Sequence, residues 1–437
     1  MRHLYYPLVL LLIAGNASAQ NIDKIITKPY VDNLIKTLSS DEMQGRATFS
    51  PGIDKAATFI EGEFKKIGLK PLTGASGFRQ TFYKYQLSPL NNQVAVDGKT
   101  IAPENTLVLS NTAEKVNFNQ ANSDGWIKLD AGKPFKAQLR AILNSKKRQL
   151  VLVDPKFAAD FNLMKGYFAK GAAMDEKEMN QANSPASILV LTADTAIKTF
   201  DVALQYSLKK LPLFNVAGMI PGKSKAKELV VFSGHYDHLG FLPAVGQDSI
   251  ANGADDDASG TTAMIALAKY YRSLNNNERT LIFVAFTAEE IGGYGARYFS
   301  QQLNPDEVTA MFNIEMIGKA SKFGKNTAFI TGYEKSDFGK ILQKNLAGTA
   351  FTFHPDPYTE QNLFYRSDNA TLAALGVPAH TISTDQIDID KLYHSVKDEY
   401  SSLDTENILS VIRALALSAR TIVKGTDTPV RIPKLAN

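Results

Sequence analysis

The chain of 437 residues carries 48 Lys and Arg residues against 44 Asp and Glu residues, and 44% of its residues are hydrophobic. This balance excludes a disordered or collagen-like chain, and because no block of basic residues occurs we expect no nucleic-acid partner. The sequence has no Cys, which excludes disulfides, thiolate nucleophiles and Cys-ligated zinc. Any metal site must therefore use His and carboxylate ligands.

Residues 1–19 have the pattern of an export signal. A basic start at Arg2 is followed by an apolar run over Leu8–Ala14 and by small residues at Ala17-Ser18-Ala19. We expect the mature protein to begin near Gln20 and to be exported to the periplasm or the extracellular space. Because no later stretch reaches about 18 apolar residues, we expect no stable membrane insertion after the signal is removed. A buried N-terminal helix is the alternative interpretation.

Residues 20–93 form the first part of the main domain, and their clearest element is a helix. Apolar residues recur with helical spacing from Gly52 to Ile67, and Gly68 ends the pattern. Residues 94–211 differ, because short β-like runs alternate with polar segments rich in Asn and Lys. We interpret this stretch as an inserted, smaller α+β domain. Its predicted strands are Thr106–Leu109, Trp126–Leu129, Gln149–Val153 and Ser187–Leu191.

Residues 212–437 form the second part of the main domain and repeat a strand, loop and helix order. Thr280–Phe286 is almost entirely apolar, as expected for a strand covered by helices on both faces, and Ser259–Tyr271 has helical apolar spacing. This alternation predicts an α/β fold with three layers around a mixed, mainly parallel sheet. The other predicted strands are Glu228–Gly234, Ala310–Ile317, Thr327–Thr331 and Pro378–Ile382, and the other predicted helices are Ala296–Leu303, Ser336–Leu346 and Thr405–Val423.

Polar clusters follow successive predicted strands of this second part. They are Gly234–Gly240, Asn252–Gly260, Glu289-Glu290, Asn313–Met316 and Tyr393-His394. Ligand sites of parallel sheets lie beyond the carboxyl ends of the strands, so these side chains are expected to meet at one rim. Taken singly, each cluster is explained as a loop histidine, a helix cap or solvated charge. Together, His and carboxylate groups at one rim predict a divalent metal site, because adjacent carboxylates repel unless a cation neutralises them.

These clusters also carry a family resemblance. GHYDHLG, NGADDDASG, the Glu289-Glu290 pair, NIEMIG and YHSVKDE resemble, in order and spacing, the co-catalytic zinc aminopeptidases. The wider family includes glutamate-carboxypeptidase-like, transferrin-receptor-like and glutaminyl-cyclase-like proteins. The resemblance covers about Leu213 to Val423 and implies a zinc-exopeptidase-like fold, so that residues 20–93 and 212–437 are the two parts of a peptidase domain. Residues 94–211 match only in position the apical or protease-associated insert of family members.

The resemblance implies a site for two Zn²⁺ ions. His235 and Glu315 would ligate one ion, His394 and Glu290 would ligate the other, and Asp256 would bridge both. Two zinc ions that share a water lower its pKa and polarise a carbonyl group, which is the chemistry that peptide hydrolysis requires.

The resemblance also implies roles for three residues that do not ligate the ions. Glu289 would be the general base, Tyr393 would stabilise the oxyanion, and Asp237 would orient the imidazole of His235. The chain departs from the family pattern at Glu315, where many members have Asp, and at Asp257, where many have Asn.

Other polar residues stay open to a structural explanation. His238 and His380 have no role in the predicted site, and Arg46 and Arg366 are candidates for a substrate pocket or for structural ion pairs. The leading hypothesis is an exported zinc exopeptidase that removes N-terminal residues from peptides. A carboxypeptidase or dipeptidase of the same family, or an inactive receptor-like binding protein, is the alternative. Side-chain preference, the native metal and the oligomeric state stay open.

Overall fold

The computed structural model describes residues 22–110, 115–169, 173–175 and 185–435, so the predicted signal at 1–19 lies outside the described residues. The chain divides into two units: Met1–Phe82 with Leu213–Asn437, and Tyr83–Pro212. The second unit begins at Tyr83 and not at the predicted residue 94. The reason is that strand β1 (Arg79–Val96) runs without interruption through the boundary, so no local change in the sequence marks it.

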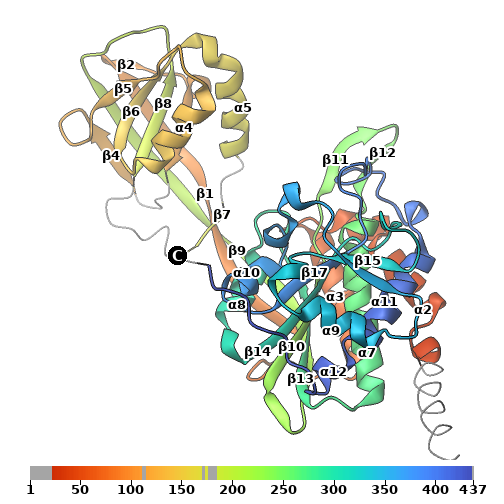
Figure 1. Cartoon of the computed structure of the whole chain (residues 1–437). Helices are drawn as coiled ribbons and strands as arrows, with labels where there is room; N and C mark the ends of the chain where they lie inside the picture. Colours follow the sequence, from red (N-terminus) through yellow and green to blue (C-terminus); the bar gives the residue numbers. More distant parts are fainter. Residues whose placement is uncertain (1–21, 111–114, 170–172, 176–184, 436–437) are drawn as a thin grey trace, which may run out of the picture. The chain divides into compact units, whose positions relative to one another are not determined.

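The first unit is built on a mixed sheet (Figure 1). Strands β10, β13, β14 and β17 pair in parallel, whereas β9 pairs antiparallel with β13, and β15 pairs antiparallel with β17. In spatial order, the strands are β16 (Thr352–Pro355), β15 (Thr327–Ile330), β17 (Ala379–Ser383), β14 (Val308–Ile314), β10 (Lys225–His235), β13 (Arg279–Phe286) and β9 (Phe200–Ile220).

Helices cover both faces of this sheet, as Figure 1 shows. One core contains side chains of α2 (Lys28–Leu38), α3 (Pro51–Ile67), α7 (Gly260–Leu274), α9 (Phe338–Asn345), α11 (Thr405–Ser418) and α12 (Arg420–Val423). A second core contains side chains of α8 (Tyr294–Gln301) and α10 (Asn369–Ala374). Every residue of β13 is buried between these cores. The predicted three-layer α/β fold with a mixed, mainly parallel sheet is confirmed.

Local sequence explains where the best-predicted elements end. Helix α3 begins at Pro51, which suits the first turn because Pro has no N–H to donate, and it stops at Gly68. Gly68 has a φ of 80°, a left-handed conformation that closes the helix by hydrogen bonds to Phe64 and Lys65. The predicted closing helix Thr405–Val423 is divided into α11 and α12 around Ala419.

Some elements are absent from the sequence prediction. The main one is a hairpin of β11 (Gly240–Val245) and β12 (Asp248–Ala251) between the first two polar clusters. Its residues are largely exposed, so the sequence lacks the alternation of apolar and polar residues that marks a half-buried strand. A short 3₁₀ segment, Asp41–Arg46, was also not predicted.

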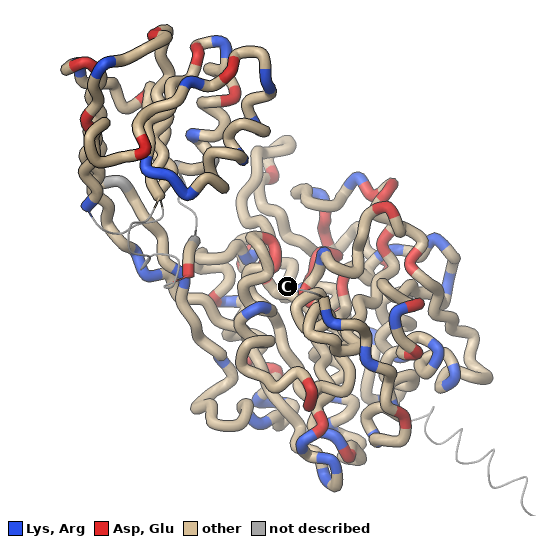
Figure 2. Tube along the Cα trace, turned by 60° about the vertical axis from the view of Figure 1, so that its left-hand side comes forward, with Lys and Arg blue, Asp and Glu red and all other residues tan. Residues whose placement is uncertain are grey.

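The second unit contains a sheet with the order β3 (Thr106–Ser110), β8 (Ala186–Leu191), β6 (Arg148–Val153) and β5 (Trp126–Lys128). These are the four strands predicted from short β-like runs in the insert. Helices α4 (Phe135–Asn144) and α5 (Ala158–Ala169) accompany them, and their buried side chains share a core with the sheet. The short strands β2 (Lys99–Thr100), β4 (Val116–Asn119) and β7 (Ala173–Met174) pair with β1 or β9. Basic and acidic residues are interspersed in both units (Figure 2).

Candidate metal centre

The predicted ligands lie at the carboxyl ends of neighbouring strands of the first unit. His235 is the last residue of β10, and Glu315 follows β14 directly. Glu290 is in the loop after β13, and His394 is in the loop after β17. Asp256 lies in the turn that leads into α7. Because β10, β13, β14 and β17 run parallel, their carboxyl ends share one edge of the sheet.

The first half of the site is the buried histidine at the end of β10. His235 is 1% exposed, and its Nε2 atom lies 3.1 Å from Oδ1 of Asp256. Its Nδ1 atom is 3.1 Å from the main-chain oxygen of Asp237. Burial alone would lower the pKa of His235, but the carboxylates of Asp256 and its neighbours raise it well above the ordinary value. Glu315 adds a carboxylate that interacts electrostatically with this imidazole.

The second half of the site is a histidine in a loop. Nε2 of His394 lies 3.3 Å from Oδ2 of Asp256 and 3.2 Å from Oε2 of Glu290. Burial acts to lower the pKa of His394, but these two carboxylates raise it to about 10. The imidazole stacks on Tyr393, with 3.8 Å between the ring centroids. The structure therefore brings four of the five predicted ligands into direct contact, with one oxygen of Asp256 facing each histidine.

The donor set fits a metal ion. Nε2 of His235 and Oε2 of Glu315 are buried and make no hydrogen bond to the described residues, although a carboxylate oxygen lies 3.1 Å from that nitrogen. Polar atoms left unpaired in a protein interior are costly unless another partner satisfies them. Imidazole nitrogens and carboxylate oxygens at this spacing are a ligand set that zinc accepts.

Asp237 makes two kinds of contact at the site. The main-chain oxygen of Asp237 contacts His235, whereas its carboxylate oxygen lies 3.9 Å from the same Nδ1 atom. The carboxylate instead accepts hydrogen bonds from the main-chain N–H groups of Glu289 (3.1 Å) and Glu290 (3.3 Å) and from the hydroxyl of Thr48 (3.2 Å). Its side chain therefore fixes the loop that carries the Glu pair.

Two further carboxylates fix the turn that carries Asp256. Asp257 accepts hydrogen bonds from the main-chain N–H groups of His235 (3.0 Å), Gly260 (3.0 Å) and Met316 (3.2 Å). Asp398 accepts from the N–H of Asp256 (3.1 Å) and from that of the preceding residue. Asp257 thus ties the ends of β10 and β14 to the start of α7, a role that its position in the sequence did not reveal.

The two spare histidines have different surroundings. His380 is buried, and both of its ring nitrogens have partners, the oxygen of Thr331 and the hydroxyl of Ser336, each at 2.8 Å. Burial lowers its pKa to about 4, which is consistent with a neutral structural residue. His238 belongs to the site, because its Nδ1 atom lies 2.7 Å from Oε1 of Glu290. Sequence reasoning missed this contact.

Arg46 is a structural residue and does not line a substrate pocket. It is fully buried, and its guanidinium group donates hydrogen bonds to main-chain oxygens only. The acceptors are Tyr236 (2.9 Å), Leu38 (2.6 Å), Asn252 (2.6 Å) and Gly253 (2.9 Å). The guanidinium group therefore joins the N-terminal segment to the two loops that flank the metal ligands.

A cavity of about 80 Å³ adjoins the ligands. Glu289 and Tyr393 contribute to its wall together with Asp256 and Glu315, and Arg366 also lines it. Burial and neighbouring carboxyl groups raise the pKa of Glu289 well above its ordinary value. This cavity places an acid with high proton affinity beside the candidate metal centre.

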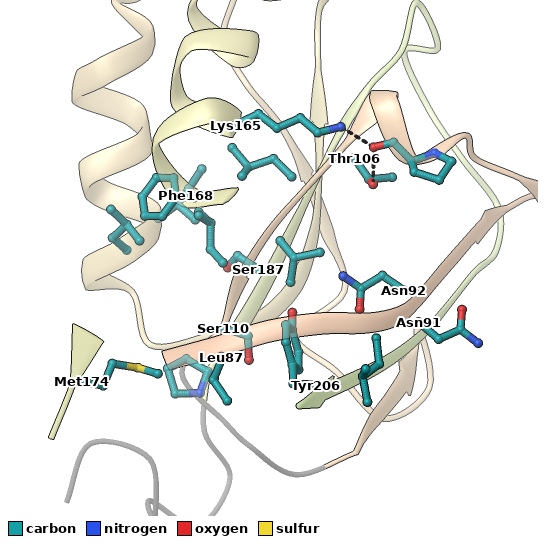
Figure 3. A pocket seen from close by; sticks show the side chains of 18 residues that line it. Leu87, Asn91, Asn92, Thr106, Ser110, Lys165, Phe168, Met174, Ser187 and Tyr206 are labelled. Carbon is teal, nitrogen blue, oxygen red and sulfur yellow. Dashed lines mark hydrogen bonds between the residues drawn. The ribbon is translucent and has the colours of Figure 1, made fainter. Parts of the chain in front are cut away.

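The second unit has a larger cavity of about 530 Å³ (Figure 3). Its wall is mainly apolar, and the labelled polar side chains include Asn92, Lys165 and Tyr206. None of the described residues that line it is His, Asp or Glu. This cavity therefore lacks the donor set of the candidate metal centre.

Comparison with known proteins agrees with this geometry. Residues 215–419 match the family described as Peptidase family M28. Among curated proteins, aminopeptidase YwaD of Bacillus subtilis is 31% identical over 121 residues, which are 26% of this chain and 24% of that protein. Leucine aminopeptidase 1 of Penicillium rubens is 29% identical over 213 residues, 45% of this chain and 52% of that protein. The alignments thus span between a quarter and about half of these relatives.

The fold also resembles a solved structure, an aminopeptidase from Aneurinibacillus sp. strain AM-1. The TM-score is 0.53 at 19% sequence identity, and the alignment covers 95% of this chain and 97% of that chain. At this identity, the similarity concerns the fold. The resemblance predicted from the polar clusters is confirmed to this extent: residues 215–419 of this chain match peptidase family M28.

Proposed function

We propose that the protein is a zinc-dependent aminopeptidase with two metal ions. The observation that carries this proposal is the carboxylate of Asp256, whose Oδ1 faces His235 at 3.1 Å and whose Oδ2 faces His394 at 3.3 Å. One carboxylate between two imidazoles is the arrangement that a bridging ligand requires. The similar proteins, which include aminopeptidases and probable zinc metalloproteases, support the choice of metal and reaction.

The ligands divide into two sets around Asp256. His235 and Glu315 complete one set, and His394 and Glu290 complete the other. When bound, two zinc ions supply a nucleophilic water near neutral pH and polarise the carbonyl group of the substrate. Each set contains one imidazole and one carboxylate besides the shared ligand, so every proposed ligand is in the predicted list.

Two residues of the cavity wall complete the chemistry. Glu289, in the wall of this cavity, would accept a proton from the attacking water and return it to the leaving amine. The hydroxyl of Tyr393 donates a hydrogen bond to the oxygen of the tetrahedral intermediate. Burial raises the pKa of Tyr393, which keeps its hydroxyl protonated and able to donate.

The substrate class is a peptide with a free N-terminal amine. The carboxylates around the site attract this cationic amine, and the adjoining cavity receives a side chain. A carboxypeptidase or dipeptidase would need a cation to hold the terminal carboxylate of its substrate. Arg366 is the cation in the wall of the cavity, and this observation favours the carboxypeptidase as the second candidate.

Metal analysis and a blocked peptide library test the proposal. We expect two zinc equivalents per chain, release of N-terminal residues from peptides with a blocked C-terminus, and loss of this release after chelation. Peptides blocked at the N-terminus should stay intact. Cleavage of only the N-terminally blocked peptides would replace the aminopeptidase with a carboxypeptidase, and a protein without metal or hydrolysis would be a binding protein.

Export to the periplasm or the extracellular space is part of the proposal. It rests on the sequence pattern of residues 1–19. Within the part of the chain that the structure describes, no helix has the length and apolar character needed to cross a membrane. Determining the N-terminus of the protein recovered from culture tests the proposal, and we expect it near Gln20.

A further inference from the structure

The histidines of the first unit differ in what the second ring nitrogen contacts. A histidine that ligates a metal through one nitrogen almost always donates its other N–H to an oxygen. His235 has this pattern, because its Nδ1 atom lies 3.1 Å from the oxygen of Asp237, while Nε2 faces only the carboxylate of the proposed ligand Asp256. His380 has two protein partners and no free nitrogen. The ring contacts of these two histidines therefore differ in the way expected for a ligand and for a structural residue.

His238 matches neither pattern. Its Nδ1 atom lies 2.7 Å from Oε1 of Glu290 and 3.7 Å from Oδ2 of Asp256. Its Nε2 atom is buried without a hydrogen-bond partner among the described residues. Binding a metal through Nδ1 would leave an N–H at Nε2 buried without an acceptor, which is costly. Donation from Nδ1 leaves only a lone pair at Nε2, so the geometry favours a donor.

We propose that His238 is a positioning residue that holds Glu290 for the metal. Its Nδ1–H group donates to Oε1 of Glu290, which leaves Oε2 of the same carboxylate directed at the ion, 3.2 Å from Nε2 of His394. This inference rests on the proposed function, because it assigns Glu290 to the ion bound by His394. The residue adds orientation and does not itself contact the metal.

The backbone around His238 keeps the ring in this place. The main-chain N–H of His238 donates to the oxygen of Arg46 (3.2 Å). The ring packs against Gly253, where an added Cβ would lie 2.6 Å from ring atoms Cγ and Cδ2. Gly253 also has a φ of 53°, which a residue with a side chain rarely adopts. A glycine is therefore needed where the imidazole passes.

Three substitutions of His238 separate donation from ligation. His238→Asn keeps an N–H donor near the position of Nδ1, His238→Gln moves the donor away from it, and His238→Leu removes it. We expect His238→Asn to keep both zinc ions with nearly native affinity. The other two variants should bind one of the two ions about 10- to 100-fold more weakly. The matched control is His354→Leu, because His354 stacks on Phe323 outside the site.

The readouts are zinc affinity by competition with a chromogenic chelator, the visible spectrum of the Co²⁺-substituted protein, and kcat separately from KM. In His238→Gln and His238→Leu, the Co²⁺ spectrum and the zinc affinity should change at only one of the two metal sites. The fall in kcat should be larger than the rise in KM. If His238→Asn loses the ion as fully as His238→Leu, the imidazole is itself a ligand and the proposal is wrong. Native affinity in all three variants also overturns it, whereas a wild-type protein without zinc refutes the proposed function first.

Discussion

The two halves of the candidate metal centre are built in different ways. His235 ends a strand in the middle of the sheet, is 1% exposed and has one ring nitrogen fixed by a main-chain oxygen. His394 lies in a loop with a φ of 56°, and its side chain is 37% exposed. The first half is therefore fixed by the sheet, whereas the second half depends on a loop and opens to solvent.

This difference predicts that the two halves differ in metal affinity and in access to substrate. A ligand fixed before binding loses little conformational freedom, so the ion at His235 should bind more tightly. A half-exposed ligand allows substrate to approach, and Tyr393, which directly precedes His394 in the same loop, lines the adjoining cavity. Under the proposed function, the fold would hold one ion, and the other would lie where substrate can reach it.

Removal of the shared ligand should abolish metal binding in both halves of the site. We expect Asp256→Ala to lose both ions and to lower kcat/KM by about 10⁴-fold or more, because both imidazoles face this one carboxylate. Metal content and hydrolysis of aminoacyl-nitroanilides are measured together, with the exposed Asp388→Ala as a control. A variant that keeps both ions would show that another acid is the bridge.

Removal of the proton carrier should separate chemistry from metal binding. Glu289→Gln should keep both ions in place and lower kcat by about 10² to 10⁴-fold, since the amide cannot accept the proton. Zinc content and the pH profile of kcat test this expectation. Turnover at the native rate would exclude Glu289 from the mechanism.

Single substitutions of the two histidines should affect the two metal affinities separately. We expect His394→Asn to lose the more weakly bound ion and to keep the other, whereas His235→Asn weakens the tighter ion by about 10- to 100-fold or more. Stepwise removal of zinc by a chelator, followed by metal analysis, measures the two affinities. Equal affinities in the wild-type protein would contradict the assignment of a tight and a weak half.

The smallest effect concerns pH in the metal-free protein. The pKa of His394 is raised from 6.5 to about 10 in the fold, so the folded state binds the proton more tightly than the unfolded state. The stability that the folded state gains from this tighter proton binding is complete below pH 6.5 and is lost as the pH rises to about 10. We expect the free energy of unfolding to fall over this range, by on the order of 1 kcal/mol after solvent screening.

Urea unfolding in the presence of a chelator, at several pH values between 6 and 10, measures this slope. His394→Asn should show a smaller slope than the wild-type protein because it lacks the titrating imidazole. Identical slopes would mean that the carboxylates around His394 do not stabilise its charged form. The buried His235 contributes in the same direction, so the slope should be reduced and not abolished.

The sequence predicted the parts of the molecule that depend on local pattern. Apolar runs located β10, β13 and β14, and the parallel order placed His235, Glu290 and Glu315 at one edge. These predictions succeeded because the strand period and the direction of parallel strands are fixed by backbone geometry.

The remaining details depend on contacts between distant segments. Asp257 accepts hydrogen bonds from the main-chain N–H groups at the end of β10 and at Met316. In the sequence, Asp257 was noted only as a departure from the family pattern. His238 meets Glu290 across 52 positions of sequence. Asp237 was expected to orient the imidazole of His235, and only the loop conformation shows that its main-chain oxygen makes this contact. Loop conformation is set by tertiary structure, which no local pattern encodes.

The buried guanidinium group of Arg46 has a consequence for truncation. It connects the segment before α3 to the main-chain oxygens of Tyr236, in the first polar cluster, and of Gly253, in the second. A fragment restricted to residues 215–419, which carry the family match, would contain the proposed ligands but would lack this cation and helices α2 and α3. Such a fragment would leave those carbonyl groups unpaired, so the smallest autonomous catalytic piece has to include the N-terminal segment.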